Sequence, residues 1–183
     1  LHPVTNSFQI VVAHSDDAGA TWSPAAAVGP ARGSTQTFSS LAVGADGTLD
    51  VAWLTLDRHV QMARSVDGGD HFTQRTLVAL AAYLPSGTCR IGGMRVPAQP
   101  SRCISSSPQI TADRVRGRVY VTWGAAGTSG TEENVYVSAY DAATLAPLVS
   151  ARQVNPPDAT PSDQFLPMSA VDESTGRLWA CWY

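Results

Sequence analysis

Two eight-residue segments with a shared pattern constrain the fold more than any other feature of this chain. Ser15–Trp22 reads S-D-D-A-G-A-T-W, and Ser65–Phe72 reads S-V-D-G-G-D-H-F. Each segment stands between two apolar runs, which cover residues 9–13, 25–28, 60–63 and 76–80. Apolar runs joined by a short segment rich in Asp and Gly are typical of a β-hairpin. We therefore expect each segment to form the turn of a hairpin.

The residue types of the two segments suit a structural turn. An Asp carboxylate accepts hydrogen bonds from backbone N–H groups a few residues on, and Gly adopts a positive φ without strain. The aromatic residue that ends each segment is expected to pack against a neighbouring sheet. The predicted structural turn residues are Ser15, Asp17, Gly19, Thr21, Trp22, Ser65, Asp67, Gly69 and Phe72.

A second hairpin pattern occurs three times. In each copy a Gly precedes a Trp by six residues, an Asp stands before the turn, and a Gln stands near the start of the first strand. The pairs of Gly and Trp are Gly47 and Trp53, Gly117 and Trp123, and Gly176 and Trp182, with Asp46, Asp113 and Asp172 and with Gln36, Gln109 and Gln164. The regular spacing favours a repeated architecture over the alternative, a compact β-sandwich.

Combining the two patterns gives a repeat of four strands. We expect a half blade at 1–30, a blade at 38–80, a long inserted loop at 81–106, a blade at 107–154 and a half blade at 164–183. A four-stranded repeat of this length predicts an all-β protein of the β-propeller class. Because propellers have four to eight blades, we interpret the chain as part of one propeller domain, with the remaining blades of the same propeller as partners.

The eight-residue segments resemble the Asp-box (BNR) repeat of the sialidase superfamily. This resemblance implies antiparallel four-stranded blades, six in the complete propeller, and an activity on glycans of the exo-α-sialidase type. It also implies that ligands contact the face opposite the Asp-box turns, where loops on a rigid scaffold carry function. The alternatives are a non-catalytic propeller that binds glycan or protein at that face, and a purely structural module.

Five residues are candidates for chemistry on that face. Asp57 and Glu133 are predicted as catalytic carboxyl groups, since a carboxyl pair on adjacent loops suits acid catalysis on a glycosidic bond. Arg58, Glu132 and Arg95 are predicted to bind substrate. Met94-Arg95-Val96-Pro97 resembles the sialidase motif in which an Arg binds the sugar carboxylate, although it follows the second Asp-box and lies in a predicted loop.

The three cysteines point to an oxidising compartment. Cys89 and Cys103 lie in one long loop, and we expect a disulfide between them, with two free thiols as the alternative. Cys181 is expected to be a small buried residue in a strand. A disulfide would place the protein outside the cytosol, secreted or at the cell surface. The first residues show no signal peptide.

Composition and motifs exclude other function classes. The net charge is −3, and the twelve basic residues, all Arg, form no basic stripe, which argues against a nucleic-acid partner. No apolar run approaches the roughly 20 residues of a membrane span. Neither a phosphate-binding glycine loop nor a zinc-ligand spacing is present, so we expect no cofactor and no metal.

Overall fold

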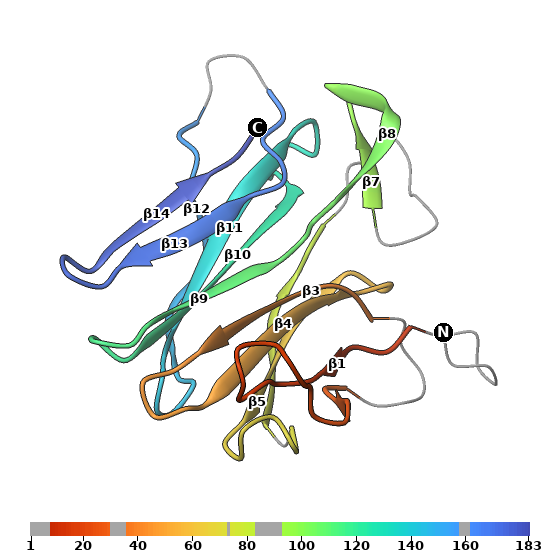
Figure 1. The fold of residues 1–183 in the computed structure, drawn as a ribbon. Helices are drawn as coiled ribbons and strands as arrows, with labels where there is room; N and C mark the ends of the chain where they lie inside the picture. Colours follow the sequence, from red (N-terminus) through yellow and green to blue (C-terminus); the bar gives the residue numbers. More distant parts are fainter. Residues whose placement is uncertain (1–7, 30–35, 73, 83–92, 158–161) are drawn as a thin grey trace.

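The computed structural model describes residues 8–29, 36–72, 74–82, 93–157 and 162–183, and it is all-β across these ranges (Figure 1). Two four-stranded antiparallel sheets form its centre. The first sheet contains β3 (Gln36–Val43), β4 (Leu49–Thr55), β5 (His59–Ser65) and β6 (Gln74–Leu80). The second contains β9 (Gln109–Asp113), β10 (Arg118–Ala126), β11 (Glu133–Asp141) and β12 (Pro147–Gln153).

Three two-stranded sheets complete the described structure. They are β1 (Val11–Val12) with β2 (Ala26–Ala27), β7 (Gly93–Val96) with β8 (Gln99–Ser105), and β13 (Met168–Asp172) with β14 (Arg177–Cys181). Each four-stranded sheet follows chain order, so neighbouring strands are joined by hairpins, as the repeat predicts. No helix long and apolar enough to cross a membrane occurs in the described ranges.

The sheets are arranged as a fan whose innermost strands are neighbours. β9 lies beside β3 on one side and beside β13 on the other. The Ser40 hydroxyl accepts a hydrogen bond from Ile110 N at 3.2 Å, and the Thr122 hydroxyl donates to Ser169 Oγ at 3.2 Å. These bonds join successive sheets. The fan of antiparallel sheets agrees with part of a propeller, while the total number of blades stays a prediction.

The main core lies between the two four-stranded sheets. Leu54 and Met62 of the first sheet are buried in one cluster with Val121 and Trp123 of the second. A smaller cluster around Trp53 lies on the other side of the first sheet and includes Ile10 and Val12 from the β1 hairpin. Apolar residues on both faces of β4 therefore pack against neighbours on both sides of the sheet. The continuous apolar run 51–54 is typical of a strand that is buried on both faces.

Both repeated segments form the expected hydrogen-bonded turns. Asp17 accepts hydrogen bonds from Thr21 N at 2.8 Å and from Thr21 Oγ1 at 2.6 Å, while Ser15 Oγ accepts one from Gly19 N at 2.8 Å. Asp67 Oδ1 accepts from His71 N at 3.0 Å, and Ser65 Oγ accepts from the N–H group of Gly69 at 2.9 Å. These contacts support a structural role for both turns.

The aromatic residues of the two turns differ in their surroundings. Phe72 packs against the Trp53 cluster, whereas the side chain of Trp22 is 65% exposed. The expected packing of Trp22 against a neighbouring sheet is therefore absent among the described residues.

Two further expectations differ from the structure. The predicted loop 81–106 contains the β7–β8 hairpin, in which the buried Val96 and Ile104 pack against Ala126 and Phe165. Pro97 argued against a strand in the sequence, because proline cannot donate a hydrogen bond to a neighbouring strand. In the structure Pro97 lies in the turn of the hairpin, where no such hydrogen bond is needed. Cys181 is exposed and free, because it lies on the outer face of the β13–β14 hairpin. The predicted disulfide involves Cys89, which lies outside the described residues, so this pairing stays a prediction.

Candidate functional site

The loops at the end of the sheets opposite the turns of Asp17 and Asp67 form one face, which we call the loop face. It comprises the turn 56–58 between β4 and β5, the loop 127–132 between β10 and β11, the turn of the β7–β8 hairpin, and the residues that follow β12. Backbone hydrogen bonds link these segments, from Ala81 N to Arg58 O, from Ala126 N to Ala82 O and from Gln164 N to Glu133 O, each 2.8 Å long. The loop face is therefore tied to the rigid sheets beneath it.

A polar pocket of about 310 Å³ lies on this face, between the loop 127–132 and the residues that follow β12. We call it the loop pocket. Its lining residues supply hydroxyl groups, side-chain amides and one carboxylate, and they are Thr128, Ser129, Glu132, Asn134, Gln153, Pro157 and Ser162. Hydroxyl, amide and carboxylate groups are donors and acceptors of the kind that bind polar ligands through directed hydrogen bonds.

The Glu132 carboxylate is held in place within the loop pocket. Its Oε2 accepts hydrogen bonds from the hydroxyl groups of Ser129 and Thr131, and its Oε1 accepts one from Asn134 Nδ2 at 3.4 Å. A Cβ atom on Gly127 would lie 2.3 Å from Asn134 Nδ2 and 2.6 Å from Glu132 Oε1. The backbone at Gly127 therefore approaches the ends of both side chains closely.

Buried amides support the base of the loop pocket. Asn134 is 5% exposed, and its Oδ1 accepts a 2.7 Å hydrogen bond from Asn155 Nδ2. The same Asn155 amide donates to Gln164 Oε1 at 3.1 Å, and Gln164 Nε2 donates to Ser162 Oγ at 2.8 Å. Because each amide is fixed by the next, the pocket is preorganised for a ligand.

Glu133 is the most perturbed titratable group of the described residues. Its side chain is fully buried between the second sheet and the segment before β13, and neither carboxyl oxygen has a hydrogen-bond partner in the described structure. Burial, and to a smaller extent the charge of Asp163, raise the pKa of Glu133 to about 8. A Cβ on Gly124 would lie 2.2 Å from Glu133 Oε1, so Gly124 provides the space that the carboxyl occupies. Glu133 is therefore a protonated acid at neutral pH.

Asp163 connects three segments next to Glu133. Its Oδ1 accepts a hydrogen bond from Glu133 N at 3.1 Å, and its Oδ2 accepts one from Ala98 N at 2.8 Å. Ala98 lies in the turn of the β7–β8 hairpin. The Asp163 carboxylate therefore fixes the hairpin to the first residue of β11.

The second predicted carboxyl group, Asp57, lies on the same face at a different place. Its Oδ2 is 2.8 Å from His59 Nδ1, and a hydrogen bond from Thr55 together with His59 holds the pKa of Asp57 below its usual range. Asp57 and Glu133 share no contact, since Ala81, Ala82 and the end of β10 lie between their loops. The structure thus shows one protonated and one ionised carboxyl group, but it does not bring them together.

The predicted substrate-binding residues are also spread over the loop face. Glu132 lines the loop pocket, whereas Arg58 lies in the β4–β5 turn with a φ of 69° and donates its backbone N–H to Thr55 O at 2.9 Å. Arg95 is exposed on β7 and not in a loop. The sequence analysis missed Asn134, Asn155 and Ser162. Of the amides that support the loop pocket, only Gln164 had been singled out in the sequence, as one of the three glutamines that recur near the start of a hairpin.

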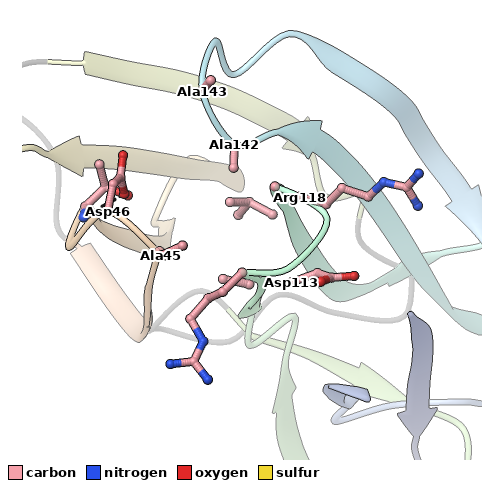
Figure 2. A pocket seen from close by; sticks show the side chains of 12 residues that line it. Ala45, Asp46, Asp113, Arg118, Ala142 and Ala143 are labelled. Atoms are coloured by element: carbon pink, nitrogen blue, oxygen red, sulfur yellow. Dashed lines mark hydrogen bonds between the residues drawn. The ribbon is translucent and has the colours of Figure 1, made fainter. Parts of the chain in front are cut away.

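A second hollow, of about 210 Å³, lies between the two four-stranded sheets on the opposite face (Figure 2). Its walls include Ala45, Ala142 and Ala143, while Asp113 and Arg118 point away from them in Figure 2. The carboxylates of Asp46 and Asp113 are engaged by Thr48 and Arg116 within their own turns. This hollow is mainly apolar, and both of its carboxylates are engaged within their own turns.

No group of three or more His, Cys, Asp or Glu residues that could hold a metal ion occurs within the described ranges.

Comparison with known proteins reveals similarity in structure and not in sequence. No family model and no curated protein matches the chain. The K499G mutant of NanB sialidase from Streptococcus pneumoniae matches with a TM-score of 0.57 at 12% identity, covering 96% of this chain and 24% of NanB. NanB with Optactamide gives a TM-score of 0.55 at 13% identity, with the same coverage.

A GH43 endo-arabinanase from Bacillus licheniformis also matches, with a TM-score of 0.41 at 12% identity, over 98% of this chain and 65% of the arabinanase. The chain spans about a quarter of the length of NanB. At these identities the similarity to NanB shows the fold alone. The chain has an all-β fold of four-stranded antiparallel sheets that is shared with part of a sialidase.

Proposed function

We propose that this chain is part of a secreted or cell-surface propeller that recognises glycans through its loop face. The observation that carries the proposal is the loop pocket, whose hydroxyls, amides and carboxylate are fixed before any ligand binds. Sugars offer many hydroxyl groups that both donate and accept hydrogen bonds. A rigid pocket lined by such partners loses little conformational entropy when it binds them.

The shared fold with NanB supports a role in glycan recognition, because the NanB structure is that of a sialidase. The fold by itself does not determine activity, since function depends on the site. The proposal therefore rests on the loop pocket first and on the similarity second.

Glycoside hydrolysis of the exo-α-sialidase type is the second candidate function, and Glu133 favours it. A general acid must carry a proton at the working pH, and burial gives Glu133 that property. In this proposal a loop movement first exposes the fully buried Glu133 carboxyl. Glu133 then donates a proton to the leaving oxygen, and Asp57 provides the ionised carboxylate. Arg58, Arg95 and Glu132 would bind the substrate. Because Asp57 lies apart from Glu133, hydrolysis requires a loop movement or a carboxylate from another part of the protein.

Glycan binding is tested by screening the purified protein against an array of immobilised glycans. We expect binding that is reduced at least about tenfold by Asn134→Ala, because this change removes one amide from the pocket and takes one of its acceptors from the Asn155 amide. Asp70→Ala, a change on the opposite face, is the matched control and should bind normally. If no glycan binds to the folded wild-type protein, glycan recognition is wrong.

Hydrolysis is tested separately with chromogenic aryl glycosides, including a sialoside. If Glu133 is the acid, Glu133→Gln should abolish cleavage while the variant still binds glycans on the array. Cleavage that persists in Glu133→Gln would show that Glu133 is not the acid, and it would not contradict the proposed glycan binding.

A further inference from the structure

The hairpins at the two ends of the fan are complementary halves of the four-stranded repeat. The spacing of Gly and Trp makes β13–β14 equivalent to β3–β4, and the Asp17 turn makes β1–β2 equivalent to β5–β6. These two hairpins lie at opposite ends of the fan (Figure 1). Within the first sheet β4 pairs with β5, yet β14 and β1, their equivalents, each have one edge without a strand partner among the described residues.

The register of the first sheet specifies how these two edges fit together. Ala52 of β4 is opposite Met62 of β5. The repeat makes Cys181 equivalent to Ala52 and Val12 equivalent to Met62. Val12 packs against the Trp53 cluster of the first sheet, and Cys181 is exposed on the outer face of its hairpin. Paired in this register, both side chains would lie on the same face of one sheet.

Exposed apolar residues on β3 mark the surface that the first two strands of such a sheet would cover. Leu41 is opposite Val51, so it lies on the face of the first sheet against which the β1–β2 hairpin packs. Leu41 is 57% exposed, whereas its equivalent in the second sheet, Ile110, is 6% exposed in the main core. Ile110 is buried where β3 and β4 lie beside β9. Val43, on the same face as Leu41, is also exposed, and no described strands lie over either residue in the corresponding way.

The outer face of the β13–β14 hairpin is the matching surface. Its residues are Met168, Ala170, Trp179 and Cys181. Ala52, the equivalent of Cys181, is fully buried between the first and second sheets. In the repeat this face of the first two strands therefore covers the next sheet. Both this face and the exposed part of β3 are apolar, so their contact would remove apolar surface from water.

We infer that a second copy of this chain occupies both surfaces. The β14 edge of one copy pairs with the β1 edge of the other, with Cys181 opposite Val12, and the β13–β14 hairpin covers Leu41 and Val43 of that second copy. Open strand edges are templates for pairing with another chain. Each copy uses both of its ends, so the pair closes with two-fold symmetry.

The number of sheets supports two copies. Each copy has two complete four-stranded sheets and two halves at its ends, so two copies hold four complete and two composite sheets, six in all. Propellers have four to eight such sheets, and a single copy closed on itself would have three. The inference concerns the assembly and does not depend on glycan recognition.

Val12→Cys tests the register directly. Opposite residues of antiparallel strands have Cα atoms about 4.5–5.5 Å apart, which suits a disulfide. Under mild oxidation we expect position 12 of one copy to be joined to Cys181 of the other, seen as a covalent dimer on a non-reducing gel and located by peptide mapping. Val11→Cys is the matched control, because the side chain of Val11 lies on the opposite face of the strand and should not reach Cys181.

Light scattering on the wild-type 183-residue chain measures the assembly independently. We expect a particle of twice the mass of the chain. Leu41→Glu should raise its dissociation constant at least about tenfold, because a charge would be buried in an apolar contact. Leu41 is exposed within one copy, so this change should leave the fold intact. Val115→Glu, in an exposed turn between β9 and β10, should leave the dimer unchanged.

Four results would overturn the inference. A monomeric wild-type chain would show that no second copy binds, and species that grow beyond two copies would show that the pair does not close. A disulfide between position 12 and Cys181 of the same copy would assign the edge to that copy. Equal cross-linking of Val11→Cys and Val12→Cys would rule out the register. If Val12→Cys does not fold, light scattering of the wild-type chain and Leu41→Glu decides alone.

Discussion

At the scale of single residues, two adjacent glutamates have opposite environments. Glu132 faces the open loop pocket, where three donors hold its carboxylate, whereas Glu133 points to the other side of β11 and is fully buried without a partner. Glu132 belongs to the loop that precedes β11, whereas Glu133 is the first residue of that strand, so two neighbours in sequence acquire different chemistry. Burial makes one carboxyl an acid and exposure leaves the other a hydrogen-bond acceptor.

The buried acid predicts how stability depends on pH. The pKa of Glu133 is raised from its ordinary 4.5 to about 8, so between these values the unfolded chain is ionised there and the folded chain is not. Unfolding then releases a proton, and the free energy of unfolding should fall by up to about 1.4 kcal/mol per pH unit across this window, becoming level above it. In Glu133→Gln the free energy of unfolding should lack this dependence on pH, because the amide does not titrate.

Chemical denaturation of both proteins at pH 5, 6.5 and 8 measures the effect. Glu133→Gln should gain stability relative to the wild-type protein as the pH rises. The carboxyls with lowered pKa values, such as Asp172 and Glu173 at about 2, titrate below this window and cancel in the comparison. Parallel pH profiles for the two proteins would show that Glu133 is ionised in the folded state.

At the scale of elements, Asp carboxylates organise the turns of the face opposite the loop pocket. Asp17, Asp67, Asp141 and Asp172 each accept hydrogen bonds from backbone N–H groups within the following four residues. Asp141 shows that the third hairpin of this kind keeps the carboxylate although its sequence lacks the Ser and Gly of the other two. The carboxylate is thus the common feature of these turns.

Loss of the Asp67 carboxylate should destabilise the fold and leave ligand binding intact. Asp67→Ala removes the acceptor for Ser65 Oγ, His71 N and His71 Nδ1, so we expect a lower thermal unfolding midpoint. Asp70→Ala is the matched control, because Asp70 is exposed in the same turn and has no hydrogen-bond partner in the described structure. Differential scanning calorimetry and sugar titration decide the result. A weakened sugar affinity at an unchanged midpoint would contradict the structural role.

At the scale of the whole molecule, one exposed face of the fan is apolar. Met168, Ala170, Trp179 and Cys181 lie on the outer face of the β13–β14 hairpin, where Met168 is 63% and Trp179 is 60% exposed. The opposite face of this hairpin packs towards β9. Contiguous apolar surface of this kind marks an interface, and in this fold the expected occupant is a further sheet of the same propeller.

This surface predicts that the isolated chain of 183 residues associates in solution. Size-exclusion chromatography with light scattering over a range of concentrations should show species larger than a monomer. The double change Met168→Glu with Trp179→Lys should shift the chain towards the monomer, because charged groups on the face oppose burial. Val115→Glu, in an exposed turn away from this face, should not. A concentration-independent monomer of the wild-type chain would show that the face needs no partner.

The sequence by itself determined the parts of the fold that rest on local interactions. The hairpin turns around Asp17 and Asp67 were predictable because the carboxylate and its donors lie within four residues of one another. The order of strands in the two four-stranded sheets followed from the spacing of Gly and Trp and from the apolar runs, since neighbouring strands are joined by short turns.

Only the tertiary structure decided the site. Asn134, Asn155 and Gln164 come from segments up to 30 residues apart, and their shared hydrogen bonds exist only when β11 and the residues after β12 lie side by side. The burial of Glu133 over Gly124 and the exposure of Cys181 depend in the same way on which surface covers which strand. A short motif reports the hydrogen bonds of its own backbone, whereas burial and proton affinity depend on neighbours that the local sequence does not contain.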